Sequence, residues 1–242
     1  MDPWIVVYLV VLILFLPCVI VGGIFQIKVN STFDKYSKVT ASCGVTAYDF
    51  TTVLLHRAGI TDVDVATING KLTDCYDSKH KVVKLSKATA SSMSVAAIAV
   101  CAHEVGHAIQ DNRKMFLFRL RHALVPVVNF ISKMFVPLVL LGSILSFMFY
   151  LPIVGLYITW ASVILYGASL LFQLVTLPLE YDASRRAIKL LKETDAMARD
   201  ELDISQKVLK SAIMTYVSSV TISMLYFLRF LSYAMIFARR KD

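Results

Sequence analysis

The sequence predicts a mainly α-helical integral membrane protein with about four transmembrane helices and one small α+β unit. Two observations predict this class. First, 57% of the 242 residues are hydrophobic, only 17% are charged, and the mean hydropathy is +0.66, whereas a soluble domain is about half apolar and about a quarter charged. Second, the apolar residues gather in uncharged runs, and about 20 such residues cross a bilayer. This composition excludes a disordered chain and a collagen-like repeat.

The first two uncharged runs account for three of the expected spans. Run 4–26 has neither a basic leader nor a small-residue cleavage pattern, so we interpret residues 1–26 as a retained N-terminal transmembrane anchor. Run 134–179 is too long for one span. It suits a transmembrane hairpin, assigned to 124–179, with its turn near 151–155.

The last uncharged run covers 211–228 and is followed by Arg229 and then by a basic tail. We expect a C-terminal transmembrane helix and this tail within 211–242. An amphipathic or buried helix is the alternative interpretation of the same run.

The basic residues indicate which way the polar segments face. Of 25 Lys and Arg residues, 14 lie in 26–133 and seven in 178–210, and the predicted hairpin places both segments on one side of the membrane. Because cytoplasmic segments are enriched in basic residues, we expect a multi-pass cell membrane protein whose polar segments face the cytoplasm. A complete fourth span would place the tail on the other side, so the side of the tail stays open. Basic and aromatic residues do not interleave in a binding pattern, which excludes nucleic acid as a partner.

Residues 27–123 are expected to form the small α+β unit. The hydrophobic spacing and turn residues predict a helix over 45–59, strands over 63–68 and 82–85 with a hairpin near 76–79 between them, and a serine-capped helix over 91–110. We also expect the strand at 82–85 to present a free edge on which an extended peptide can pair. The small side chains of the last helix indicate tight packing on several faces.

That last helix carries the sequence AHEVGH, an HExxH motif formed by His103, Glu104 and His107. Residues four apart share a helix face, so both imidazoles can bind one ion. Glu104 is rotated by about 100° from His103. Its carboxylate therefore lies beside the ion, where a general base takes a proton from water. We expect one Zn²⁺ ion bound by the two histidines, Glu104 as the catalytic base, and a zincin-like unit around them.

Catalytic zinc needs a third protein ligand, and no histidine follows the motif in 109–117. The best candidates are Glu180 and Asp182, at the start of the segment 180–210, which we assign as a third-ligand helix. Two residues apart, they face nearly opposite sides of a helix, so only one can reach the ion. Glu180 is favoured and Asp182 is the alternative. Ser184, one turn after Glu180, can accept a hydrogen bond from a ligand histidine.

Four segments together resemble the YugP-type neutral zinc metallopeptidases of bacterial membranes: DCYDSKHKVVKLS, AHEVGHAIQ, RHALVP and LPLEYDASRRA. The resemblance covers most of the chain, about residues 45–212. More distantly, the HExxH motif, the membrane hairpin and the Glu-Tyr-x-Ala element are similar to the HtpX and CAAX-protease group. There the glutamate of this element is the third zinc ligand, which implies Glu180. The aspartate of that element corresponds to Ser184, so this chain departs there and Asp182 stays an alternative.

These features predict a membrane-embedded zinc metalloendopeptidase that hydrolyses peptide bonds, on membrane-associated or misfolded protein substrates. The partners are thus the lipid bilayer and a peptide or protein substrate, and the sequence leaves the oligomeric state open. A developing oxyanion needs a further donor besides zinc. The candidates, which spacing does not separate, are Tyr181, Arg185, His122 and His80.

Two other functions compete with this prediction. A site-2-type intramembrane protease carries an Asp-Gly ligand motif in a later span, and no Asp-Gly pair occurs in this sequence. Charged residues such as Asp111 and Arg113 also follow the HExxH motif closely. A catalytically silent, zinc-stabilised scaffold or adaptor needs metal ligands but no base, and the presence of Glu104 argues against it.

Overall fold

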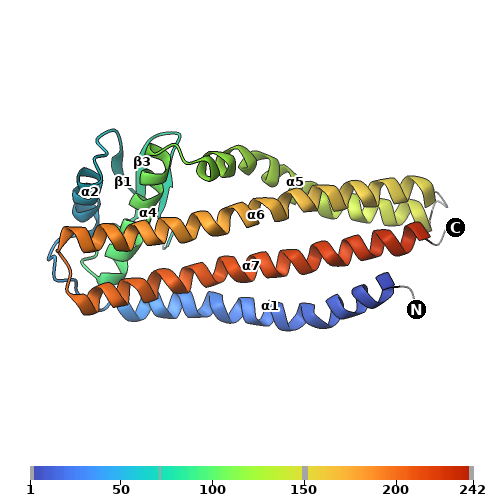
Figure 1. The fold of residues 1–242 in the computed structure, drawn as a ribbon, viewed down its shortest axis with the longest axis horizontal. Helices are drawn as coiled ribbons and strands as arrows, with labels where there is room; N and C mark the ends of the chain where they lie inside the picture. Colours follow the sequence, from blue (N-terminus) through green and yellow to red (C-terminus); the bar gives the residue numbers. More distant parts are fainter. Residues whose placement is uncertain (1–2, 71, 149–151, 240–242) are drawn as a thin grey trace. The chain divides into compact units, whose positions relative to one another are not determined.

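The computed structural model describes residues 3–70, 72–148 and 152–239 and is mainly helical (Figure 1). Its elements in chain order are α1 (Pro3–Tyr36), α2 (Ala47–Arg57), β1 (Asp64–Ile68), β2 (Cys75–Asp77), β3 (Val82–Ser86), α3 (Lys87–Ala90), α4 (Val95–Asn112), α5 (Phe116–Phe147), α6 (Pro152–Thr194) and α7 (Arg199–Arg239). Among the described residues, four helices are long and apolar enough to cross a membrane: α1, α5, α6 and α7. The predicted helical membrane fold with a small sheet is confirmed at this level.

The contacts within the chain define two units, each assembled from separate segments. The first, here termed the apolar unit, comprises Met1–Ile24, Leu120–Leu177 and Tyr216–Asp242. The second, termed the polar unit, comprises Phe25–Arg119 and Pro178–Thr215. The polar unit contains the HExxH motif and the Glu180 segment, so every group expected at the metal site belongs to one unit.

The apolar unit presents its aliphatic side chains outward and packs aromatic rings inside. Ile13 of α1 is 72% exposed, as expected for a surface that contacts lipid. Between the helices, the ring centroids of Phe15 and Tyr226 lie 4.5 Å apart, and Phe135 lies 4.8 Å from both Tyr166 and Phe230. Such close van der Waals packing is what associates helices in lipid, because no hydrophobic driving force acts there.

The two helices of the predicted transmembrane hairpin, α5 and α6, begin at other residues than the sequence predicts. Helix α5 begins at Phe116, well before the uncharged run, because the preceding polar residues continue the same helical turns. The turn expected near 151–155 is wrong for residues 152–155, since α6 already begins at Pro152. Proline is favoured in the first turn of a helix, where its missing N–H is not needed. Residue 151 and the basic residues 240–241 lie outside the described residues.

The polar unit contains a three-stranded sheet of order β1-β3-β2. Strand β1 pairs with β3 in parallel, from Asp64↔Val82 to Ile68↔Ser86, and β2 pairs with β3 antiparallel. The expectation that the strand at 82–85 has a free edge is therefore wrong, because neighbours occupy both of its sides. The edge strands are β1 and β2, and β2 lies next to the HExxH helix α4.

Helix α4 starts later than predicted. The segment after β3 forms the short helix α3, and Ser94 caps α4 by accepting a hydrogen bond from the Ala97 N–H at 3.2 Å. The predicted start at Ser91 is wrong because this serine ends α3 instead. The expected packing on several faces is confirmed: Ala96, Ala99 and Ala102 are fully buried.

The HExxH helix and α6 meet through their backbones at Gly106. A Cβ atom at this position would lie 2.5 Å from the carbonyl oxygen of Ala183, closer than any real Cβ contact. Glycine is needed here because only its lack of a side chain lets the two helices approach so closely. This contact aligns the turn that contains Glu180 with the turn that contains the two histidines.

We expect Gly106→Ala to lower the free energy of unfolding by about 1–2 kcal/mol, because the clash with the Ala183 backbone forces the helices apart. This expected change is the net effect, because alanine in a helix interior by itself raises the free energy of unfolding by about 1 kcal/mol. The measurement is thermal unfolding of the purified protein in detergent. Gly23→Ala is the matched control, since nothing lies within 4 Å of its added Cβ. A Gly106→Ala protein as stable as this control would contradict the close contact.

Candidate metal centre

Three side chains from α4 and α6 converge in the polar unit. His103, His107 and Glu180 each offer one ligand atom, and these atoms lie within 4.8 Å of one another. Glu180 Oε2 is 3.1 Å from His103 Nε2 and 3.5 Å from His107 Nε2. A tetrahedral zinc ion with bonds of about 2.0–2.1 Å separates its ligand atoms by about 3.3 Å. Both distances agree with this separation, and the described residues contain no second group of this kind.

The orientation of His107 is set by Gln110. The amide nitrogen of Gln110 donates hydrogen bonds to Leu179 O and Asp182 Oδ2, both at 2.9 Å. Its oxygen therefore faces His107 Nδ1, 2.9 Å away, and this nitrogen must carry the proton. Consequently the lone pair of His107 Nε2 faces the cluster.

Ser184 lies at the corresponding position beside the other histidine. Its Oγ atom is 3.1 Å from His103 Nδ1, the contact that its spacing from Glu180 suggests. Partners at Nδ1 hold a metal-binding imidazole with Nε2 directed to the ion. Two imidazole nitrogens and one carboxylate oxygen, oriented in this way, form a donor set that fits Zn²⁺ and leaves a fourth position for water.

Glu104 belongs to the same helix turn but is not a member of the cluster. Its Oε2 accepts a hydrogen bond from the backbone N–H of Tyr76 in the edge strand β2, at 2.8 Å. Burial raises the pKa of the Glu104 carboxyl to about 7, and His103 opposes the rise while Glu180 adds to it. The buried environment of this carboxyl group thus favours its protonated form more than water does.

Tyr76 also connects β2 to α4 by its side chain. The phenol donates a hydrogen bond to Asp111 Oδ2 at 2.7 Å, and Lys81 Nζ lies 2.8 Å from the same oxygen. Glu104 and Asp111 are seven residues apart, so they occupy one face of α4. The edge strand is therefore held along two turns of the HExxH helix, and the backbone N–H at residue 76 stays directed at Glu104.

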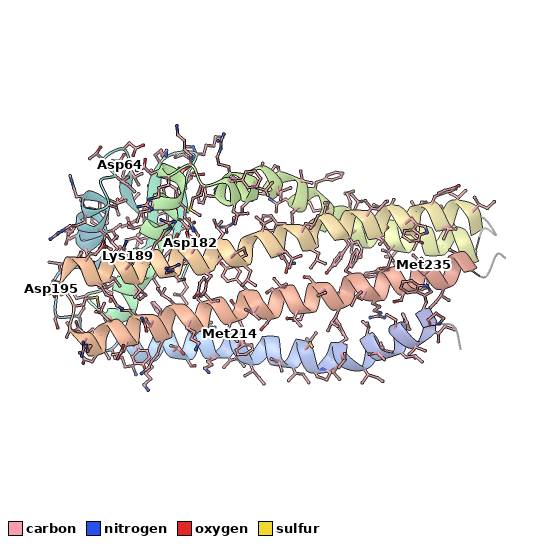
Figure 2. The ribbon with its side chains drawn as sticks, in the orientation of Figure 1. Asp64, Asp182, Lys189, Asp195, Met214 and Met235 are labelled. Carbon is pink, nitrogen blue, oxygen red and sulfur yellow. The ribbon has the colours of Figure 1, made fainter. Side chains whose placement is uncertain are left out.

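Asp182 also contacts α4, but through Gln110 and not through the two histidines. Figure 2 labels its position along α6. Its Oδ2 accepts hydrogen bonds from Gln110 and from Arg186 Nε, the latter at 2.6 Å. The carboxylate thus joins Gln110 to α6 and is not among the three clustered ligand groups.

The candidates for an oxyanion donor are all exposed, unlike the largely buried metal cluster. Tyr181 is 61% exposed, and Arg185 and His122 are also exposed. His80 is exposed as well, with its Nδ1 atom 2.8 Å from Asp77 Oδ2.

The sequence analysis missed two groups, Gln110 and the Tyr76 N–H. A signal for Gln110 was available, because it is a polar residue three positions after His107 and therefore shares the helix face of the two histidines. A backbone N–H has no sequence signal, since every residue except proline carries one.

Two histidines and one glutamate, beside a glutamate that is not a ligand, are the groups of catalytic zinc sites in metallopeptidases. The chain belongs to the family described as "Putative neutral zinc metallopeptidase", whose model matches residues 11–235. It is 40% identical over 217 residues to "Putative membrane protease YugP" of Bacillus subtilis (strain 168), which covers 90% of this chain and 92% of that protein. No solved structure matches the chain significantly. The resemblance deduced from the four sequence segments is confirmed.

We expect Gln110→Leu to lower the free energy of unfolding of the metal-free protein by about 1–3 kcal/mol. Leucine leaves the buried His107 Nδ1–H without an acceptor and removes the hydrogen bonds to Leu179 O and Asp182 Oδ2. An unsatisfied group of this kind costs about that amount. The measurement is thermal unfolding after removal of metal. The control is Gln206→Leu, at an exposed position of α7. It should change the free energy of unfolding by less than about 0.5 kcal/mol. Equal stability of the two variants would contradict the bridging role of Gln110.

Proposed function

We propose that this protein is a membrane-embedded zinc metalloendopeptidase. The observation that carries the proposal is the position of Glu104, buried beside the His103, His107 and Glu180 cluster without belonging to it. A zinc ion with a purely structural role needs ligands but no adjacent base. The family membership supports the same function at the level of a zinc peptidase.

In this proposal, His103, His107 and Glu180 hold one Zn²⁺ ion. Zinc in such a site acts as a Lewis acid and lowers the pKa of a water molecule to about 7. Glu104 accepts a proton from the attacking water and then donates it to the leaving amine. The Tyr76 N–H fixes the Glu104 carboxylate at 2.8 Å, while Ser184 and Gln110 orient the two imidazoles. Tyr181 and Arg185, exposed on α6 close to Glu180, are the proposed donors to the oxyanion.

The proposed substrates are membrane-associated or misfolded proteins, and the proposed orientation places the site in the cytoplasm. Support comes from the construction of the polar unit, because its segments continue helices α1, α6 and α7, which are apolar enough to cross a membrane. The excess of Lys and Arg in the same segments favours the cytoplasmic side. The helix with HExxH against a small sheet supports a zincin-like unit.

We expect Glu104→Gln to retain zinc and to lose cleavage by about 10²–10⁴-fold, because the amide cannot accept the proton from water. Glu180→Gln should lose zinc as well, because a carboxylate ligand is removed. The measurements are zinc content and cleavage of casein or a membrane protein by the purified full chain in detergent. Glu193→Gln, an exposed glutamate on the same helix α6, is the control and should keep both properties.

Three outcomes would contradict this assignment. Full zinc content in Glu180→Gln would exclude Glu180 as a ligand. Undiminished cleavage by Glu104→Gln would exclude Glu104 as the base. A zinc-loaded wild-type protein that cleaves no substrate would favour a silent scaffold.

We expect removal of zinc by a chelator to abolish cleavage and to lower the thermal unfolding midpoint. A metal that binds only the folded state stabilises it in proportion to the logarithm of the metal concentration over its Kd. Added Zn²⁺ should restore both properties, whereas Mg²⁺ should restore neither because it prefers oxygen ligands in octahedral geometry. Cleavage that persists after complete removal of zinc would refute the zinc-dependent mechanism.

A further inference from the structure

The polar unit also contains a cluster of positively charged side chains. These residues belong to α1 and α7, whereas the metal-site residues belong to α4 and α6. A cavity of about 360 Å³ lies between the polar segments of α1 and α7. This cavity is here termed the basic pocket, because four lysines line it: Lys28, Lys35, Lys207 and Lys210. The side chains of Ser211 and Met214 also line it.

The spacing of these lysines directs them to the same hollow. Lys28 and Lys35 are seven residues apart on α1, which places them on one helix face. Lys207 and Lys210 are three apart on α7 and are also neighbours on one face. Four like charges around one cavity repel one another unless an anion compensates them.

Among the described residues, no ion pair supplies that compensation. In the part of the chain that the structure describes, none of the four ammonium groups has a carboxylate within ion-pair distance. Other lysines of the polar unit do: Lys81 lies 2.8 Å from Asp111, and Lys84 pairs with Asp77. Lys35 Nζ instead lies over the Tyr36 ring, 5.2 Å from its centroid. The four positive charges of the basic pocket thus have no described carboxylate partner, which suits an external anion.

The position along the helices identifies the kind of anion. Lys28 is the first charged residue after the uncharged run of α1, and Lys210 directly precedes the uncharged run of α7. Both runs are long enough to cross the hydrocarbon core. The lysines thus mark the level at which hydrocarbon ends and lipid headgroups begin. Met214, one turn further into α7 and labelled in Figure 2, provides an apolar contact beside them.

We propose that the basic pocket binds the phosphate-bearing headgroup of an anionic phospholipid, with Met214 in contact with the start of an acyl chain. Basic pockets between membrane helices on the cytoplasmic side are suited to such headgroups. The bound lipid joins α1 to α7 by neutralising lysines of both helices. This site is independent of the zinc site and of the proposed peptidase activity.

The test uses the full chain in mixed micelles of phosphatidylglycerol and phosphatidylcholine, with retained lipids counted by native mass spectrometry. The wild type should retain phosphatidylglycerol selectively. The variant in which all four pocket lysines are replaced by glutamine should lose this selectivity by about a hundredfold or more, because each lysine contributes about fivefold. The control replaces four other exposed lysines by glutamine, giving the same net charge: Lys79, Lys87, Lys114 and Lys192. It should stay within about twofold of the wild type.

Further variants separate a loss of lipid binding from a loss of folding. Replacing the four pocket lysines by arginine keeps the charge and should keep the selectivity. Lys28→Gln and Lys210→Gln alone should each weaken retention about fivefold.

Three results would overturn the proposal: unchanged selectivity in the fourfold glutamine variant, an equal loss in the control variant, or full displacement of phosphatidylglycerol by inorganic phosphate. The last would assign the pocket to a free anion. Retained phosphatidylglycerol in the presence of phosphate supports the lipid.

Discussion

The candidate metal centre depends on the backbone contact between α4 and α6. Gly106 lies between the two histidines of HExxH, and Ala183 lies between Glu180 and Ser184. A Cβ at residue 106 would come within 2.5 Å of the Ala183 carbonyl oxygen, so only glycine allows this approach. Two helices at their minimum separation bring together side chains that are 77 residues apart along the chain.

A connected set of hydrogen bonds turns this proximity into a defined geometry. Gln110 uses its oxygen for His107 and its nitrogen for Leu179 and Asp182, so one buried side chain orients His107 and holds α6. On the opposite side of the motif, Tyr76 directs its backbone N–H at Glu104. Buried polar networks of this kind favour a single arrangement, because any partly broken form leaves unsatisfied groups in a low dielectric.

The sequence analysis reaches the local part of this candidate site and only a portion of its long-range part. His103, Glu104 and His107 follow from the fixed spacing of a helix, and Glu180 follows from its place after the second uncharged run. The choice between Glu180 and Asp182 could not be made in the same way, since both lie on one helix turn. The role of β3 was predicted wrongly because pairing order in a sheet depends on which strand returns beside which. Alternation within a single strand carries no such information.

The sequence by itself therefore determined the membrane-spanning runs, the HExxH helix and the family, because these depend on composition and on short periodic spacing. The tertiary structure decided which carboxylate meets the histidines, which groups orient them, and which lysines gather at the edge of the uncharged runs. These features arise from contacts between segments far apart in the chain, and the geometry of such contacts is set by packing and hydrogen bonding.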